Sequence, residues 1–195
     1  MRRMWSQTFP EHALPLHLPH AAPPLWQGLQ LLPGLTAVVG DEGSGKTHLL
    51  RALASARPDA LWLDLRLPEH DQHTPRQFWR ALQAQWPRWQ ADWQNDLTEA
   101  LQLNEHLDKA LYMLSTGSRR KVALVGLLAS GAALTCLDQA FAALDLASAR
   151  VLRDVLQDMA EHPTRACWVA DYEADADMPW RSVVRVVRTE PSPAP

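Results

Sequence analysis

The octapeptide GDEGSGKT, residues 40–47, constrains the fold of this chain more than any other stretch. It fits the pattern G-x-x-x-x-G-K-[ST]. A short, apolar and β-branched run, residues 35–40, leads into it, and the segment KTHLLRALASA that follows has apolar residues at helical spacing. A strand, a glycine-rich loop and a helix in this order predict a phosphate-binding loop within a parallel α/β sheet.

Each part of this loop has a physical role in holding a polyphosphate. The glycines let the backbone wrap the anion, so that successive N–H groups and the helix N-terminus point at it. Lys46 is expected to neutralise the terminal phosphates, and the Thr47 hydroxyl is expected to ligate Mg²⁺. The residues predicted to contact the nucleotide here are Gly40, Asp41, Glu42, Gly43, Ser44, Gly45, Lys46, Thr47 and His48.

The remaining apolar runs continue the α/β pattern. Strands are predicted near residues 60–65, 133–137, 166–170 and 183–187, and a helix over 145–161. In between, strand signals give way to helical periods. We therefore expect one domain over residues 1–190, with an inserted helical subdomain at about 67–130 and a disordered, Pro-rich tail at 191–195.

Composition and charge exclude several classes of protein. The formal net charge of −3 gives no general attraction to nucleic acid, and no nucleic-acid partner is expected. The apolar run 122–137 is shorter than a membrane span and is interrupted by a Ser-Gly turn. No apolar segment of a secretory signal follows the first arginines, so we expect a cytoplasmic protein. Cys136 and Cys167 lie among apolar residues and are expected to be buried, reduced thiols.

A second motif, LSTGSRRKV at residues 114–122, places a serine where a helix would begin. A helix cap alone would explain it. The segment also resembles the LSGGQ signature of ATP-binding-cassette (ABC) ATPases. Ser115 and Gly117 are kept, while Thr116 stands for the first glycine and Ser118 for the glutamine.

The spacing of two aspartates strengthens the resemblance. Asp138 and Asp145 follow Ser115 at about the intervals that separate the Walker B and D-loop aspartates from the signature in that family. Together the motifs cover about residues 30–175. The segment LSTGSRRKVALVGLL is most similar to the corresponding segment of small stand-alone cassettes, such as the ATPase of the haem exporter in cytochrome c maturation.

The resemblance implies an ABC-type P-loop fold that binds ATP and Mg²⁺. It also implies a head-to-tail pair of cassettes, in which the phosphate loop of one subunit and the signature of the other enclose ATP. Ser115, Thr116 and Gly117 would then complete the γ-phosphate site of the partner cassette. A further implied partner is an integral membrane transporter subunit, which would hold the protein at the inner face of the membrane.

The catalytic positions of this chain depart from the family pattern. Asp138 matches the aspartate that holds Mg²⁺. The family has a water-polarising glutamate next, but this chain has Gln139, and an amide orients a water without accepting its proton. Counting along the chain places Asp171 at or beside the family's switch histidine, either as a replacement for the missing base or as a solvent-facing strand end. We therefore expect weak or slow hydrolysis.

Two further family positions stay open. The Q-loop glutamine has Glu69 in its place, with Gln72 and Gln77 as other candidates. The aromatic residue that would stack on adenine is His20 or, as a second choice, Trp26.

The tryptophans of the helical segment allow two interpretations. Trp79, Trp86, Trp89 and Trp93 form one stripe if a helix continues past Pro87. Such a stripe is either the core of the helical subdomain or a surface for the membrane partner.

Two functions fit these observations. The first is the nucleotide-binding subunit of an ABC transporter with slow hydrolysis. The alternative is a hydrolysis-deficient, ATP-gated regulatory or assembly cassette paired with a competent subunit. The acidic balance disfavours a third class, ABC-type ATPases that act on DNA or ribosomes.

Overall fold

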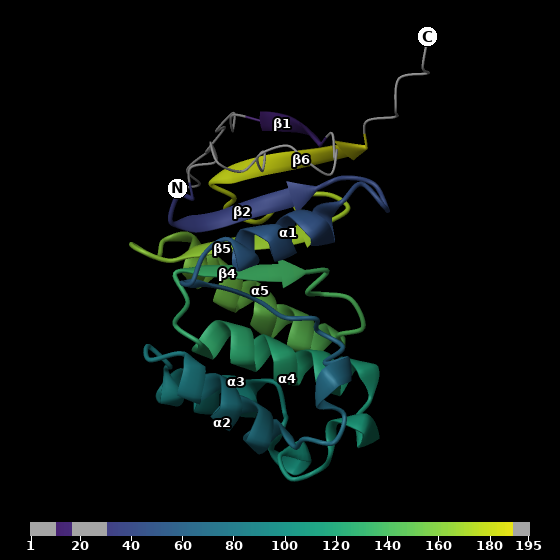
Figure 1. Ribbon diagram of the computed structural model, residues 1–195, viewed down its shortest axis with the longest axis vertical. Helices are drawn as coiled ribbons and strands as arrows, with labels where there is room; N and C mark the ends of the chain where they lie inside the picture. Colours follow the sequence, from purple (N-terminus) through teal and green to yellow (C-terminus); the bar gives the residue numbers. More distant parts are fainter. Residues whose placement is uncertain (1–10, 17–30, 189–195) are drawn as a thin grey trace, which may run out of the picture.

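A six-stranded sheet forms the centre of the protein in the computed structural model, which describes residues 11–16 and 31–188 (Figure 1). The strand order is β1-β6-β2-β5-β4-β3, and every neighbouring pair is parallel. This confirms the parallel α/β sheet predicted from the sequence. The strands are β1 (Glu11–Leu16), β2 (Gly34–Val39), β3 (Ala60–Trp62), β4 (Leu134–Asp138), β5 (Ala166–Asp171) and β6 (Ser182–Arg188).

Helices cover both faces of the sheet in layers (Figure 1). Helix α1 (Lys46–Ser55) packs on one face, and α4 (Thr116–Ala129) and α5 (Leu146–Ala160) pack on the other. Helices α2 (Pro75–Gln85) and α3 (Ala91–Ala100) pack on α4 and form an outer layer. Three short 3-10 helices, η2 (Pro68–His70), η3 (Asn104–His106) and η4 (Leu111–Met113), complete the chain between β3 and α4.

Strand β2 shows why its sequence is apolar throughout. All six of its residues are buried. Leu35, Ala37 and Val39 belong to the core shared with α4 and α5, whereas Val38 belongs to the core under α1. A strand that is covered on both faces needs apolar side chains at successive positions instead of an alternating pattern.

The segment 67–130 is helical, as predicted, and contains no strand in the structure. Its buried side chains belong to the same core cluster as the sheet residues on that face. The boundary of a separate subdomain there remains a prediction. Within residues 11–16 and 31–188, no helix combines the length and the hydrophobicity needed to cross a membrane.

The tryptophans of this segment lie on two helices and on the connection between them, which contains Pro87. Helix α2 ends at Gln85 and α3 begins at Ala91, so a continuous stripe does not form. Trp79 is buried, and its indole Nε1 donates a hydrogen bond to the carbonyl oxygen of Val122 at 2.9 Å. The other three are half-buried against the same core, which supports the core interpretation.

Two differences from the sequence prediction concern strands. Strand β1 was missed, and it lies at the edge of the sheet, where Pro15 is tolerated. Strand β3 ends at Trp62, earlier than predicted. The predicted tail at 191–195 lies outside the described residues. Cys136 and Cys167 are buried free thiols, as expected, and burial raises the pKa of both.

The parallel sheet places the chemistry-bearing loops at one edge. The carboxyl ends of β2, β3, β4 and β5 lead into residues 40–47, 63–66, 139–145 and 172–175. Because these ends meet at the same edge, loops distant in sequence come together there, where open α/β sheets bind their ligands.

Candidate functional site

The loop between β2 and α1 has the backbone shape that a polyphosphate requires. Gly43 and Gly45 adopt φ angles of 72° and 106°, and a Cβ at either position would meet no atom within 4 Å. The Ser44 hydroxyl is buried and has no hydrogen-bond partner within the described part of the chain. Helix α1 begins without a side-chain cap, which leaves its first N–H groups to point at an anion. These features fit a bound phosphate chain.

A cavity of about 460 Å³ opens beside this loop. It is lined by Glu42, Gly43, Gly45, Lys46, Thr47, His48, Arg51, Asp138 and Gln139. The structure thus brings most of the predicted loop residues together with the two residues at the end of β4.

Lys46 is folded back onto the loop. Its side chain is only 7% exposed, and Nζ donates hydrogen bonds to the carbonyl oxygens of Gly40 at 2.5 Å and Asp41 at 2.9 Å. The ammonium also lies 5.0 Å from the centre of the Tyr172 ring. The loop and the aromatic ring therefore hold the cation beside the cavity.

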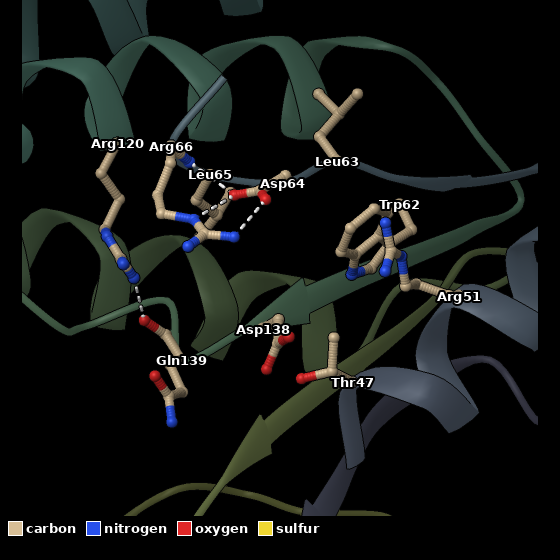
Figure 2. A pocket seen from close by; sticks show the side chains of 10 residues that line it. All are labelled: Thr47, Arg51, Trp62, Leu63, Asp64, Leu65, Arg66, Arg120, Asp138 and Gln139. Atoms are coloured by element: carbon tan, nitrogen blue, oxygen red, sulfur yellow. Dashed lines mark hydrogen bonds and ion pairs between the residues drawn. The ribbon is translucent and has the colours of Figure 1, made fainter. Parts of the chain in front are cut away.

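Thr47 and Asp138 provide a donor set suited to Mg²⁺. Thr47 stands at the start of α1 and Asp138 at the end of β4, and both line the cavity. Figure 2 shows the oxygen atoms of the two side chains pointing toward one another. A hydroxyl and a carboxylate are hard oxygen ligands of the kind that Mg²⁺ takes beside phosphates. The pair fits the predicted metal role, although no cluster of three or more His, Cys, Asp or Glu residues is found within the described residues.

Gln139 has a strained backbone that several hydrogen bonds hold. Its φ angle is 47°, a left-handed value that is uncommon for residues other than glycine. Its N–H donates to the carbonyl oxygen of Ala170 at 2.9 Å, and its carbonyl oxygen accepts from Arg120 at 2.5 Å and from the N–H of Ala142 at 3.1 Å. The side chain borders the cavity beside Asp138.

Tyr172, which follows the end of β5, is a residue beside the site that the sequence analysis did not identify. The carboxylate of Asp171 accepts a hydrogen bond from the N–H of Tyr172 at 2.8 Å. Tyr172 also accepts a hydrogen bond at its carbonyl oxygen from the N–H of Gly40 at 3.4 Å, and its ring contacts Lys46. Tyr172 therefore lies over the phosphate loop. Asp171 does not line the phosphate-loop cavity, and its catalytic role remains a prediction.

The signature-like segment forms the N-terminus of α4. Ser115 caps the helix, because its hydroxyl oxygen accepts from the N–H of Ser118 at 3.1 Å. Ser115 and Thr116 are exposed, and a Cβ on Gly117 would come within 2.6 Å of the carbonyl oxygen of Ala143. None of Ser115, Thr116 and Gly117 lines the phosphate-loop cavity of their own chain.

A salt bridge ties α4 to the start of α5. Lys121 Nζ lies 2.7 Å from Asp145 Oδ2, and Asp145 also caps α5 by accepting from the N–H of Ser148 at 2.8 Å. The hydrogen bond from Lys121, supported by those from Ser148, holds the pKa of Asp145 well below its usual range. The predicted D-loop aspartate is thus fixed to the signature helix.

A second cavity of about 270 Å³ adjoins the first (Figure 2). It is lined by Thr47, Arg51, Trp62, Leu63, Asp64, Leu65, Arg66, Arg120, Asp138 and Gln139. Of its three arginines, Arg66 belongs to no motif that the sequence analysis recognised. The position of Arg66 just after a predicted strand is the signal that would have indicated it, since parallel strands end at a common edge.

The Q-loop and adenine-stacking candidates are not brought to these cavities. Glu69, Gln72 and Gln77 line neither of them. Instead, Gln77 takes part in the capping box of α2, and its side-chain oxygen accepts from the N–H of Thr74 at 2.9 Å. His20 and Trp26 lie outside the described residues.

The loop after β3 is joined to the signature helix by Arg119. Its guanidinium donates to the carbonyl oxygen of Leu67 at 2.8 Å and pairs with the carboxylate of Asp71. On the same loop, the His70 ring packs edge-on against Phe78 with the ring centres 4.8 Å apart, and burial lowers the pKa of His70. The segment that leaves the second cavity is therefore anchored to α4.

Comparison with known proteins agrees with this geometry. The profile of the ABC transporter family matches residues 33–142. The cytochrome c biogenesis ATP-binding export protein CcmA of Hyphomonas neptunium is 34% identical over 145 residues, which are 66% of this chain and 72% of that protein.

Solved structures show the same fold. A protein from Pyrococcus furiosus that is described as an ABC transporter ATP-binding protein superposes with a TM-score of 0.65 at 19% identity. The superposition covers 80% of this chain and 86% of that chain. The ATP-binding subunit of another ABC transporter superposes with a TM-score of 0.65 at 16% identity, over 79% and 75% of the two chains. The ABC-type P-loop fold predicted from the motifs is confirmed, and the chain belongs to the ABC transporter family as one of its ATP-binding cassettes.

Proposed function

We propose that this cassette is the nucleotide-binding subunit of an exporter in cytochrome c biogenesis, and that it binds MgATP but hydrolyses it slowly. The family supplies the general role, because ABC cassettes bind ATP and pair with membrane transporter subunits. The Hyphomonas neptunium relative, an ATP-binding export protein of cytochrome c biogenesis, supports the assignment to an export step.

The presence of Gln139 beside Thr47 and Asp138 is the observation on which slow hydrolysis rests. Bound Mg²⁺ would neutralise developing charge on the transferred phosphoryl group. Lys46 binds the β- and γ-phosphates, and the Gln139 amide orients the attacking water. Since an amide accepts no proton at neutral pH, the step lacks a general base at this position, which costs about 10² to 10⁴ in rate.

A second cassette completes the site in this proposal. The N-terminus of α4 carries Ser115 and Thr116 in an exposed position, and these residues do not line their own nucleotide cavity. A helix N-terminus offers N–H groups and a positive dipole end to phosphate. An exposed helix start of this kind is suited to the γ-phosphate of ATP in a facing subunit.

The membrane partner sets the location of the protein. We infer that an integral membrane subunit recruits the cassette to the inner face of the membrane. The structure leaves Tyr112 and Met113 exposed by 58% and 61%, in η4 just before the signature segment. Exposed large apolar side chains beside a loop anchored to α4 are compatible with such a contact.

Isothermal titration and steady-state ATPase assays test the proposal together. The wild type should bind MgATP, Lys46→Ala should weaken binding at least tenfold, and Lys109→Ala, a control on an exposed lysine, should bind as the wild type does. Turnover should be slow in the isolated protein. Equal affinity of wild type and Lys46→Ala would reject nucleotide binding at this loop.

The regulatory alternative is separated by a partner experiment. A purified cassette that keeps its glutamate and histidine is added to this one. ATP turnover that appears only in the mixture, and that persists when this chain carries Gln139→Ala, would favour the ATP-gated regulatory role. Turnover by the isolated protein that Gln139→Ala removes supports the transporter subunit with a slow site of its own.

A further inference from the structure

The second cavity opens onto the end of the phosphate loop where the terminal phosphate of ATP would lie. It shares Thr47, Arg51, Asp138 and Gln139 with the first cavity. Arg66 and Arg120 line this cavity together with Asp138 and Thr47, and Figure 2 shows the Arg66 guanidinium turned toward Asp64 and the Arg120 guanidinium toward the carbonyl oxygen of Gln139. The two cavities therefore meet at the predicted Mg²⁺ ligands.

Two of the three arginines at this junction are held by fixed contacts. The Arg51 guanidinium lies over the Trp62 ring, 4.5 Å from its centre. Arg120 donates to the carbonyl oxygen of Gln139 at 2.5 Å. Burial lowers the pKa of Arg120, and the carboxylates of Asp138 and Asp64 act in the opposite direction, so these charges lie close enough to influence one another.

Arg66 has a different environment. Its side chain is 75% exposed, and it pairs with the carboxylate of Asp64, two residues earlier, through Nε at 3.0 Å and Nη2 at 2.7 Å. An ion pair this exposed adds little to stability, because water already solvates both charges. A guanidinium also matches phosphate oxygens with two parallel hydrogen bonds, which are stronger than neutral ones. The pairing with Asp64 is thus weak enough for the Arg66 guanidinium to exchange that carboxylate for a phosphate.

We propose that Arg66 binds the γ-phosphate of ATP from within the same subunit, and that Asp64 holds the guanidinium at the cavity until the nucleotide arrives. The inference rests on the proposed nucleotide binding and adds to it a residue that distinguishes ATP from ADP. Only a nucleoside triphosphate carries the phosphate that reaches this junction. Asp64 also keeps the turn in shape, because its Oδ1 accepts from the N–H of Arg66 at 2.9 Å.

Isothermal titration with Mg²⁺ and either AMP-PNP or ADP tests the proposal without relying on turnover. Arg66→Ala should weaken AMP-PNP binding about tenfold and change ADP binding less than twofold. Arg66→Lys keeps the charge but loses the bidentate geometry, so it should fall between wild type and Arg66→Ala. Asp64→Asn keeps an acceptor for the turn and removes the competing charge, so AMP-PNP should bind more tightly.

Arg57→Ala is a matched control. Arg57 pairs with Asp59 at the same two-residue spacing and with distances of 3.0 and 2.9 Å, but it precedes β3 and lines neither cavity. It should leave both affinities unchanged. Equal weakening of AMP-PNP and ADP by Arg66→Ala, or no weakening of either, would overturn the role of Arg66. A wild type that binds neither nucleotide would reject the proposed function itself, and the inference with it.

Discussion

Arg120 donates a hydrogen bond to the carbonyl oxygen of Gln139, at 2.5 Å, from the first turns of the signature helix. The next residue, Lys121, pairs with Asp145. Two consecutive basic residues of α4 thus hold both ends of the segment that joins β4 to α5. Three hydrogen bonds stabilise the left-handed backbone of Gln139, because its N–H donates one and its carbonyl oxygen accepts two.

Removal of the Arg120 guanidinium should lower turnover without changing nucleotide affinity. Arg120→Met keeps much of the side-chain volume but releases the Gln139 carbonyl, so the water-orienting amide loses its position. We expect kcat to fall about tenfold while KM for ATP stays within twofold. Arg120→Lys should recover part of kcat. The assay is steady-state ATPase activity, with thermal unfolding as a check on folding. An equal rise in KM would show that Arg120 acts on binding instead.

Restoring a carboxylate at residue 139 should raise the rate of hydrolysis. Gln139→Glu supplies a proton acceptor next to Asp138, and we expect a gain of about tenfold or more. The gain is limited by repulsion from Asp138 and by the absence of a switch histidine. Asp171→His alone and combined with Gln139→Glu should show whether that position acts with residue 139. Brisk wild-type turnover that Asp171→Ala abolishes would transfer the catalytic role to Asp171.

The sequence predicted those parts of the site that are defined by local motifs. The loop at 40–47, the strand ending at Asp138 and the cap at Ser115 each have a signature of a few consecutive residues, and the structure places them as expected. The parallel order of the strands followed from alternating apolar strand and helix segments.

The site residues that were not predicted from the sequence are those that come together from distant segments of the chain. Arg66 and Tyr172 have no motif of their own, and only the register of β3 and β5 in the sheet brings them to the phosphate loop. Counting without gaps from Asp145 pointed to Asp171, one residue from the side chain that contacts Lys46. A shift of one residue at a strand end reverses which side chain faces the site.

The Tyr172 ring should contribute to nucleotide binding through Lys46. Tyr172→Ala removes the ring beside the ammonium and should weaken both ATP and ADP binding, by about threefold, because a partly exposed cation–π contact contributes 0.5–1 kcal/mol. Tyr172→Phe keeps the ring and should behave like the wild type. The measurement is titration of the three proteins with each nucleotide. A loss in Tyr172→Phe that is confined to ATP would instead assign the phenol hydroxyl to the γ-phosphate.

Acid should weaken the link between α4 and α5. The pKa of Asp145 is lowered on folding, so its charged form stabilises the native state above its unfolded pKa of about 4, and this contribution is lost as the pH falls below that value. The Asp145 side chain is 57% exposed, so the effect should be small, under about 1 kcal/mol. Asp145→Asn retains a helix cap but no charge. Urea unfolding from pH 7 to pH 3 should therefore show a shallower loss of stability in this variant, and parallel curves would contradict the prediction.

Thr116 should limit how tightly two cassettes close on ATP. It is exposed at the first position of α4 and carries a side chain where the family signature has glycine. Thr116→Gly removes this bulk from the surface that would face the partner's nucleotide, so the ATP-dependent dimer should become several-fold more stable, whereas Thr116→Trp should prevent it. Gly117 is less suitable for this test, because a Cβ there would already clash with Ala143 within its own chain. Sedimentation with ATP and with ADP measures the effect, and Thr164→Gly, in the loop between α5 and β5, controls for the loss of a threonine elsewhere. If ATP produces the same dimer in the wild type, Thr116→Gly and Thr116→Trp, the N-terminus of α4 does not form the interface.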